Sequence, residues 1–359
     1  MKTEVEEIFA YYLPQYHTIK ENDEWWGEGF TEWVNLRNAK KLFPDHKIPY
    51  PIEPLGYYDL TDVKTIEKQY ALAKKHEVST FCFWHYWFDD EDLLLEKPAE
   101  LILKSDIDVK FCFAWANHSW WNKSKNILLK EQKYNFSLSK YFDYLLPFFK
   151  DPRYTKIDNK PVFIIYDLKN ACNGESLISY FIERSKKEGF NGVYFIGENL
   201  LPSDKQINLV EQYLNSCDFM KHRYLIRKVF DKIIMMAQKH NIVLPRIYNY
   251  ETLIKKMNTD IELQSKQIPI IFPGWDSSFR HGKKGVVLKN TNPKAFEEHV
   301  NKTSLLMSQK QTHPKIVMIK SWNEWAEGNY IEPCSIHGDS YLKILAKYFD
   351  TLSIKKDNV

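Results

Sequence analysis

The stretch KIVMIKSWNEWAEGNYIEP, residues 315–333, joins a short apolar run to a cluster of aromatic and acidic side chains. The run Lys315–Lys320 has the length and composition of a strand that is buried on both faces of a parallel sheet. Tryptophan and glutamate residues follow it at once. Because the active sites of α/β barrels lie at the carboxyl ends of the strands, this stretch predicts a parallel strand that ends in a site.

Similar apolar runs recur along the chain and give eight candidate strands in all. The other seven are Ile8–Leu13, Ser79–Trp84, Val109–Ala114, Val162–Tyr166, Val193–Gly197, Cys217–Met220 and Ile268–Phe272. Amphipathic segments of helical period accompany them at Asp62–His76, Phe136–Phe149, Ser176–Glu188, Tyr224–Lys239, Pro293–Ser308 and Ser340–Asp350. Eight alternating strands without a glycine-rich first turn predict a (β/α)8 barrel of the TIM type, not a doubly wound sheet.

The connection Pro14–Leu60 is much longer than most links in such folds, and we expect this first loop to roof the site. The chain shows no internal repeat, low-complexity tract or flexible linker, which predicts one domain over residues 1–359. The segment Lys239–Lys256 is expected to form a small excursion from the barrel.

The overall charge of the 359-residue chain is close to balanced. Fifty basic residues stand against 47 acidic ones, a net charge of +3, which argues against a dedicated nucleic-acid-binding protein. The five cysteines are widely spaced and predict reduced thiols. The first residues carry acids where a leader needs bases, and their apolar stretch is too short to cross a bilayer. The sequence therefore predicts a cytoplasmic protein without a transmembrane segment.

Polar and aromatic side chains gather just past the predicted strands. A sugar ring offers apolar faces that stack on aromatic rings and hydroxyls that bind carboxylates and amides, so the set predicts a carbohydrate ligand. The alternative is that these side chains simply plug the barrel mouth. The candidate substrate-binding residues are Tyr12, Gln15, His85, Tyr86, Trp115, Asn117, Tyr166, Trp275, Asp276, Arg280 and Asn323.

Glu324 and Glu327 are the candidate catalytic residues. Three residues apart in a helical turn, their side chains share one face, and proximity and burial push the pKa values of such a pair apart. Cleavage of a glycosidic bond needs that division between an acid and a base or nucleophile. The alternative, a solvated helix face, fits poorly with the flanking Trp322 and Trp325.

Metal and cofactor chemistry finds little support in the sequence. Asp90-Glu91-Asp92 formally matches the Asp-x-Asp motif of nucleotide-sugar transferases, but without a phosphate-binding loop nearby we expect a solvated acidic turn. The histidines show no zinc-binding spacing. We predict neither a metal nor a cofactor.

Several motifs together resemble the WbsX-like proteins, a group related to glycoside hydrolase family 99, the endo-α-mannosidase family. They are YYLPQYH (11–17), WWGEGFTEW (25–33), PLGYYDL (54–60), FWHYWF (83–88), CFAWANHSW (112–120), KPVFIIY (160–166), PGWDSSFR (273–280) and WNEWAEGNYIEP (322–333). They occur in order over nearly the whole chain.

The resemblance implies a (β/α)8 barrel that acts on α-mannoside-like linkages with retention of anomeric configuration. It assigns to Glu324 the removal of a proton from the sugar 2-hydroxyl, which attacks the anomeric carbon and forms a 1,2-anhydro sugar. It assigns to Glu327 the protonation of the leaving group and then the activation of the acceptor. No carboxylate needs to attack carbon directly.

The WbsX-like group is associated with bacterial surface polysaccharide, meaning lipopolysaccharide, O-antigen or capsule. The expected substrate is therefore an oligosaccharide or polysaccharide, and polysaccharide-assembly proteins are possible partners. Two alternatives stand beside hydrolysis. One is a transglycosylase or glycosyltransferase that passes the glycosyl unit to a sugar hydroxyl, and the other is a non-catalytic polysaccharide-binding barrel, which would not need both glutamates.

Overall fold

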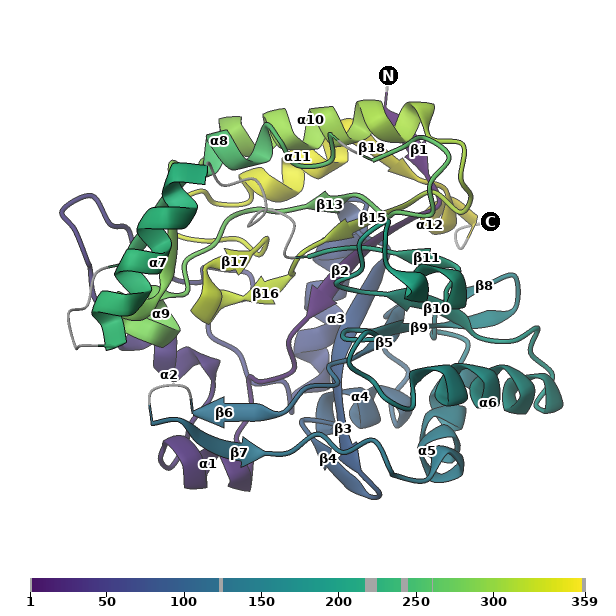
Figure 1. Ribbon diagram of the computed structural model, residues 1–359. Helices are drawn as coiled ribbons and strands as arrows, with labels where there is room; N and C mark the ends of the chain where they lie inside the picture. Colours follow the sequence, from purple (N-terminus) through teal and green to yellow (C-terminus); the bar gives the residue numbers. More distant parts are fainter. Residues whose placement is uncertain (1, 123–124, 217–224, 240–244, 260, 357–359) are drawn as a thin grey trace.

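The computed structural model describes residues 2–122, 125–216, 225–239, 245–259 and 261–356. Its centre is a curled sheet of eight parallel strands (Figure 1). Neighbours in the sheet follow the order of the chain, and the last strand returns beside the first. The strands are β2 (Glu7–Tyr12), β3 (Thr80–Asp89), β5 (Phe111–Trp115), β9 (Lys160–Ile165), β10 (Tyr194–Gly197), β11 (Gln212–Tyr213), β13 (Ile270–Ile271) and β15 (Ile316–Ile319).

The number, direction and order of these strands agree with the prediction, but the sheet is not a closed ladder. β11 and β13 occupy its two edges and are two residues long each. A single parallel bridge, Tyr213–Gln267, joins β11 to the segment before β13. The predicted sixth strand, Cys217–Met220, lies outside the described residues, and β11 takes the sixth position. The short antiparallel strands β4 (Asp92–Leu94) and β8 (Lys156–Ile157) extend β3 and β9.

The central strands are buried on both faces, as their continuous apolar sequences predict. Successive side chains alternate between a face inside the curl and a face toward the helices. Inside, Tyr11 stacks on Trp84 with ring centroids 4.3 Å apart. On the helix side, Tyr12 stacks on Phe83 at the same distance of 4.3 Å. Two aromatic layers therefore enclose the same pair of strands.

Helices pack outside the sheet close to their predicted positions. The side chains of Asp62, Ser137 and Asn292 accept backbone N–H bonds as N-caps and fix the first turns of three of them. The predicted helices appear as α3 (Val63–Lys75), α5 (Leu138–Lys150), α6 (Gly174–Lys187), α7 (Leu225–Lys239), α10 (Pro293–Gln309) and α11 (Ser340–Tyr348). Near α10 and α11, β1 (Thr3–Val5) pairs with β18 (Phe349–Thr351).

The long first connection folds over the carboxyl ends of the strands. It contains α1 (Lys20–Trp26) and α2 (Glu32–Arg37), and Trp33 of α2 packs on Tyr16, Tyr58 and Trp325. The expected roof is thus in place. The predicted excursion contains β12 (Arg246–Asn249) and α8 (Tyr250–Ile254), and β12 pairs with β14 (Val286–Lys289) outside the main sheet.

The shorter elements complete the rim and the outer surface. They are α4 (Lys97–Leu103), β6 (Trp120–Asn122), β7 (Ile127–Lys130), η1 (Lys205–Leu209), α9 (Ser278–His281), η3 (Gly282–Lys284), β16 (Asn323–Glu324), η4 (Trp325–Glu327), β17 (Asn329–Tyr330) and α12 (Leu352–Lys356). Among the described residues, no helix combines the length and apolar character needed to span a bilayer.

Candidate active site

The two candidate catalytic glutamates lie on a small hairpin that follows β15. Asn323 and Glu324 form β16, which pairs antiparallel with β17, and a single 3₁₀ turn, η4, joins the two. The Ser321 hydroxyl accepts the backbone N–H groups of Asn323 and Glu324 at 3.2 and 3.1 Å. Glu324 lies in the strand before the turn and Glu327 ends the turn, and both carboxylates approach the Arg280 guanidinium.

The turn ends at Gly328, whose left-handed backbone (φ +55°) suits glycine. A Cβ atom here would lie 2.6 Å from the Asp276 Cβ atom. The segment between β13 and α9 therefore presses directly against the turn. The Asp276 N–H donates to the Glu327 carbonyl at 2.6 Å and holds the two segments together.

Arg280 of α9 brings three carboxylates together. Its Nη1 lies 2.6 Å from Glu327 Oε1, and its Nη2 lies 3.0 Å from Glu32 Oε2 and 3.7 Å from Glu324 Oε2. Glu32 is the first residue of α2 in the roof, and only 3% of its side chain is exposed. α2, α9 and the β16–β17 hairpin, which carry these residues, lie on the same side of the sheet (Figure 1).

The protonation states within this carboxylate cluster, defined as Glu32, Glu324, Glu327 and Arg280, differ from one group to the next. Burial, together with the negative charge of Glu327, raises the pKa of Glu324 to about 8, while Arg280 opposes the shift. Burial would lower the pKa of Arg280, but the surrounding carboxylates outweigh it and raise the pKa, so the guanidinium stays charged. The raised pKa thus favours the protonated form of Glu324 at neutral pH, beside an ion pair between Arg280 and Glu327.

A second group of side chains inside the curl lies next to Glu324. The Tyr11 hydroxyl donates to the buried carboxylate of Glu198. Lys320 stabilises the charged forms of both Glu198 and Glu324, which lowers their pKa values against the larger effect of burial. Its Nζ also lies 5.1 Å from the centroid of the Trp275 ring. Aromatic faces, a cation and carboxylates thus border one another, as binding a polyhydroxylated ring requires.

Glu332, near the end of the same motif, binds the side chains of its two tryptophans. Its Oε1 accepts from Trp322 Nε1 and Gln69 Nε2 at 2.8 and 2.7 Å. Its Oε2 accepts from Trp325 Nε1 and the Tyr58 hydroxyl at 2.6 and 3.0 Å. Burial raises the pKa of Glu332 to about 7, and these four hydrogen bonds limit the shift. Glu332 therefore fixes the two tryptophans that flank Glu324.

Several predicted binding residues do border the carboxylate cluster. Arg280 is one of them, and Tyr86 is another. Burial raises the pKa of the Tyr86 hydroxyl, and the negative charge of the nearby Glu324 raises it further. Asp276 and Trp275 form the adjoining wall. Tyr166 contacts Trp84 edge-on at 5.6 Å on the inner face. The carbonyl of Gln15 accepts from the Glu32 N–H at 3.1 Å and so places that acid.

Three other predicted residues lie on the helix side of the sheet, away from the carboxylate cluster. The Tyr12 hydroxyl donates to Gln69 Oε1 at 2.6 Å. His85 stacks on Tyr144 of α5, and burial lowers its pKa to about 3, so the ring is neutral. Trp115 is fully buried and its Nε1 donates to the Trp87 carbonyl at 3.0 Å. The structure gives all three side chains core contacts.

The two predicted asparagines are held by backbone groups. Asn117 accepts from the Asp167 N–H and donates to the Asp167 carbonyl, at 2.8 and 2.9 Å. Asn323 makes the same pair of bonds to Leu13 at 2.7 and 3.0 Å, which ties the hairpin to the end of β2. The acidic turn Asp90-Glu91-Asp92 makes ion pairs with lysines: Asp90 and Glu91 lie beside Lys140, and Asp92 lies beside Lys130.

Four residues of this site are not among those that the sequence predicts. Glu32 lies in the first loop and Glu198 follows the fifth strand, but neither acid belongs to a motif that marks it as a site residue. Glu332 belongs to the motif that carries the catalytic candidates, and its position between two tryptophan donors could have marked it. Nothing in the sequence signals that Lys320, the last residue of an apolar run, faces inward.

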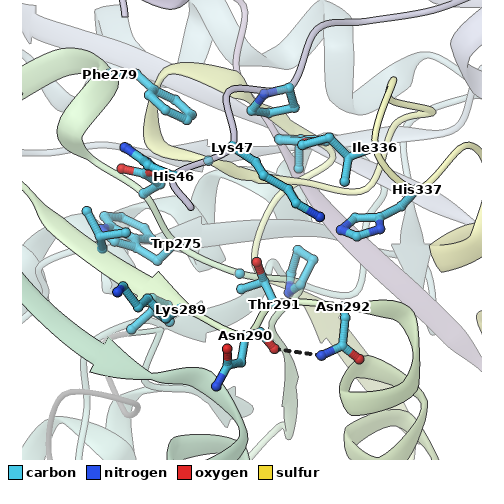
Figure 2. A pocket seen from close by; sticks show the side chains of 18 of the residues that line it. His46, Lys47, Trp275, Phe279, Lys289, Asn290, Thr291, Asn292, Ile336 and His337 are labelled. Atoms are coloured by element: carbon cyan, nitrogen blue, oxygen red, sulfur yellow. Dashed lines mark hydrogen bonds and ion pairs between the residues drawn. The ribbon is translucent and has the colours of Figure 1, made fainter. Parts of the chain in front are cut away.

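Asp276 also lines a cavity of 460 Å³, and Figure 2 shows side chains of its wall. His46 Nε2 lies 2.5 Å from Asp276 Oδ2 in its wall. The cavity is lined by the roof segment around His46, by the loop between β14 and α10, and by residues 336–337.

The chain belongs to the family described as "Glycosyltransferase WbsX", whose profile matches residues 8–345. Proteins called "Uncharacterized protein WxcX" from two strains of Xanthomonas campestris pv. campestris, B100 and ATCC 33913, are each 26% identical over 93% of this chain. The chain spans about half the length of these relatives, 48% of each.

Solved structures share the fold. A "Glycoside hydrolase-like protein" superposes with a TM-score of 0.58 at 16% identity, covering 97% of this chain and 94% of the other. The family 99 endo-α-mannosidase of Bacteroides thetaiotaomicron superposes with a TM-score of 0.53 at 17% identity, covering 98% and 97%. The protein is thus a member of a carbohydrate-active family with a glycoside hydrolase-like fold, as its motifs predicted.

Proposed function

We propose that the protein is a retaining carbohydrate-active enzyme that cleaves or transfers α-mannoside-like linkages of a bacterial surface polysaccharide, with Glu324 and Glu327 as its catalytic pair. The observation that supports this proposal most is the meeting of both carboxylates on the one guanidinium of Arg280. Such a pair, with one proton between two acids, is what general acid–base chemistry at a glycosidic bond needs.

In the proposed reaction the sugar 2-hydroxyl attacks the anomeric carbon while its proton passes to Glu324. The bond from that carbon to the leaving oxygen breaks, and the leaving oxygen takes the proton of Glu327. An acceptor hydroxyl then opens the 1,2-anhydro sugar, giving its proton to Glu327 while Glu324 returns a proton to the 2-oxygen. Two inversions at one carbon retain the configuration.

The raised pKa of Glu324 favours the opposite placement of the proton in this pair. The pKa of Glu324 is raised to about 8, whereas Glu327 is bound to Arg280 at 2.6 Å. The singly protonated pair has two arrangements, and the reaction as proposed needs the proton on Glu327. A substrate that draws Arg280 away from Glu327 would favour that arrangement. The raised pKa of Glu324 favours the alternative, in which Glu324 is the acid.

Transfer to a sugar hydroxyl is the second candidate for the outcome, because the family carries the description of a glycosyltransferase. The roof formed by α2 brings Glu32 to the same guanidinium that both carboxylates approach, that of Arg280. In either reaction the same two carboxylates act, and only the acceptor differs.

The test uses α-mannosyl fluoride beside fragments of the host polysaccharide, with products read by mass spectrometry. Fluoride leaves without a proton donor, so the variant that lacks the acid keeps activity on the fluoride and loses it on the fragments. The variant that lacks the base loses both activities, by roughly a thousandfold. With Glu327→Gln as the acid variant and Glu324→Gln as the base variant, the proposed roles predict retention only in the former.

The controls separate the outcomes. Glu298→Gln alters an exposed acid of α10, outside the carboxylate cluster, and serves as the matched variant. Rescue by fluoride in Glu324→Gln instead of Glu327→Gln would exchange the two roles. Equal activity of both variants on every substrate would contradict the proposal, and longer products in the presence of a sugar acceptor would identify transfer.

A further inference from the structure

The cavity beside Asp276 has its own set of side chains, separate from the carboxylate cluster. Glu324, Glu327 and Arg280 do not line it. Its volume of 460 Å³ lies within the range of small-molecule sites. Figure 2 shows Lys47 extending across it toward His337, with Lys289 and Asn290 along the neighbouring wall.

The cations of this cavity lack counterions within the part of the chain that the structure describes. No carboxylate there lies within ion-pair distance of Lys47 or Lys289. Lys289 Nζ instead lies 4.1 Å from the centroid of the Phe43 ring. Burial and the nearby charge of Lys47 lower the pKa of His337. The ammonium groups of Lys47 and Lys289, both exposed to solvent, thus border one cavity without an acidic partner among the described residues, beside the neutral ring of His337.

Acidic side chains do not cancel this charge locally. Asp276 is already engaged, because its carboxylate contacts His46 Nε2 and accepts from the Ser278 N–H at 2.9 Å. Asp45 also lines the cavity and, like Lys47 and Lys289, is exposed to solvent, but it lies outside ion-pair distance of both lysines. Attraction between an ammonium group and an anion is stronger in a partly enclosed cavity than on an open surface.

The remaining lining suits a sugar ring. Trp275 and Phe279 offer aromatic surface, while Asn290, Thr291 and Asn292 offer amide and hydroxyl groups. The Asn292 side chain donates to the Asn290 carbonyl at 2.9 Å, which stiffens this loop. A neutral sugar would use the aromatic and amide groups but would leave Lys47 and Lys289 without a partner.

We infer that the cavity binds an anionic sugar residue, with the carboxylate or phosphate of that residue between Lys47, Lys289 and His337. The inference rests on the proposed function, because the bound residue belongs to the same glycan that reaches Glu324 and Glu327. The wall between the two sites is thin, since Asp276 contacts His46 on one side and the backbone of Glu327 on the other.

The experiment measures binding without turnover. Methyl β-glucuronide, methyl β-glucoside and glucose 1-phosphate are titrated separately into the wild-type protein and into Glu327→Gln, and affinity is read by ligand-observed NMR. We expect the glucuronide or the phosphate to bind at least tenfold more tightly than the neutral glucoside, equally in both proteins. Preference between the two anions identifies the acidic group.

A double variant locates the site. Lys47→Gln with Lys289→Gln should weaken binding of the anionic sugar at least tenfold. The matched control is Lys283→Gln with Lys284→Gln, which removes two exposed lysines of η3 outside the cavity and should leave the affinity unchanged. Circular dichroism checks that both proteins fold alike.

The outcomes distinguish this inference from the proposed function. Equal affinity for the neutral and anionic sugars, absence of binding, or equal losses in the two double variants would overturn the anionic site. Inactivity of the wild-type protein on every glycan, with anionic binding intact and dependent on the two cavity lysines, would sink the proposed catalysis and leave the anionic site standing.

Discussion

The backbone N–H of Asp276 donates to the carbonyl of Glu327 across 2.6 Å. This one bond couples the segment that carries Arg280 to the turn that carries the catalytic candidates. It also makes the wall of the neighbouring cavity part of the same rigid unit. The positions of the guanidinium and of Glu327 therefore depend on close backbone packing at Gly328.

Gly328→Ala tests that packing. Gly328 and Gly338 have nearly the same φ, +55° and +56°, but a Cβ at Gly338 meets nothing within 4 Å. We expect Gly338→Ala to cost about 1 kcal/mol from the positive φ alone. Gly328→Ala should cost roughly 2 kcal/mol more because Asp276 must move, and it should also reduce kcat. Urea unfolding and activity of the two variants provide the comparison, and equal losses would argue against the coupling.

Removal of Arg280 tests its role as the common partner of three acids. Arg280→Met should lower the free energy of unfolding by roughly 2 kcal/mol near pH 8, with a smaller loss near pH 5. Arg280 opposes the effect of burial on Glu324, so removal of the guanidinium raises the pKa of Glu324 further above its ordinary value of 4.5. The variant then loses additional stability as pH rises through that raised pKa. A loss that does not depend on pH would contradict this arrangement.

Glu332→Gln tests the anchor below the site. The amide replaces one of the two accepting oxygens by an NH2 donor. That donor faces either Trp325 Nε1 and the Tyr58 hydroxyl or Trp322 Nε1 and Gln69 Nε2, which are themselves donors. We expect a loss of about 2 kcal/mol in unfolding free energy at pH 8 and a fall in kcat as the tryptophans shift. Wild-type stability and activity would show that the four hydrogen bonds are dispensable.

The pH dependence of wild-type stability carries a separate signature of Glu332. Its folded pKa of about 7 exceeds the ordinary value of 4.5, so the folded state holds the proton more tightly. Its contribution is greatest below pH 4.5 and falls as pH rises to 7. In Glu332→Gln this part of the slope should vanish, and urea midpoints across that interval measure it. An unchanged slope would assign the titration to another group.

A pair of aromatic substitutions tests which face of β3 and β5 meets substrate. Trp84→Phe alters the inner face next to Tyr11 and Tyr166 and should raise KM with little change in stability. Trp115→Phe removes a fully buried Nε1 bond to the Trp87 carbonyl and should cost roughly 1–3 kcal/mol of stability at unchanged KM. The reverse pattern would place the sugar on the helix side.

The strands and helices were predictable because their apolar runs and helical periods are strong local signals. The face on which each strand-end residue lies was not. Both faces of β3 are buried and aromatic, so Trp84, His85 and Tyr86 show no apolar–polar alternation from which the phase could be read. The sequence therefore predicts that His85 and Trp115 bind substrate. In the structure both side chains face the helices.

The catalytic candidates were predictable from one motif, whereas their partners were not. Glu324 and Glu327 lie three residues apart, a spacing that local geometry turns into proximity. Glu32 reaches Arg280 only because the roof folds over the sheet. The sequence shows that a long loop carries acids, and only the tertiary structure determines which acid meets which cation.

The single bridge between β11 and the segment before β13 has an evolutionary consequence. Every other neighbouring pair of the eight strands is joined by a ladder whose register would be disturbed by an insertion. Between β11 and β13 the chain leaves the sheet and returns to it, and only the Tyr213–Gln267 bridge fixes the register there among the described residues. Two described parts of this connection, residues 225–239 and 245–259, can thus change in length or sequence while the strands that hold the carboxylates keep their places. New substrate preferences can arise there without a new fold.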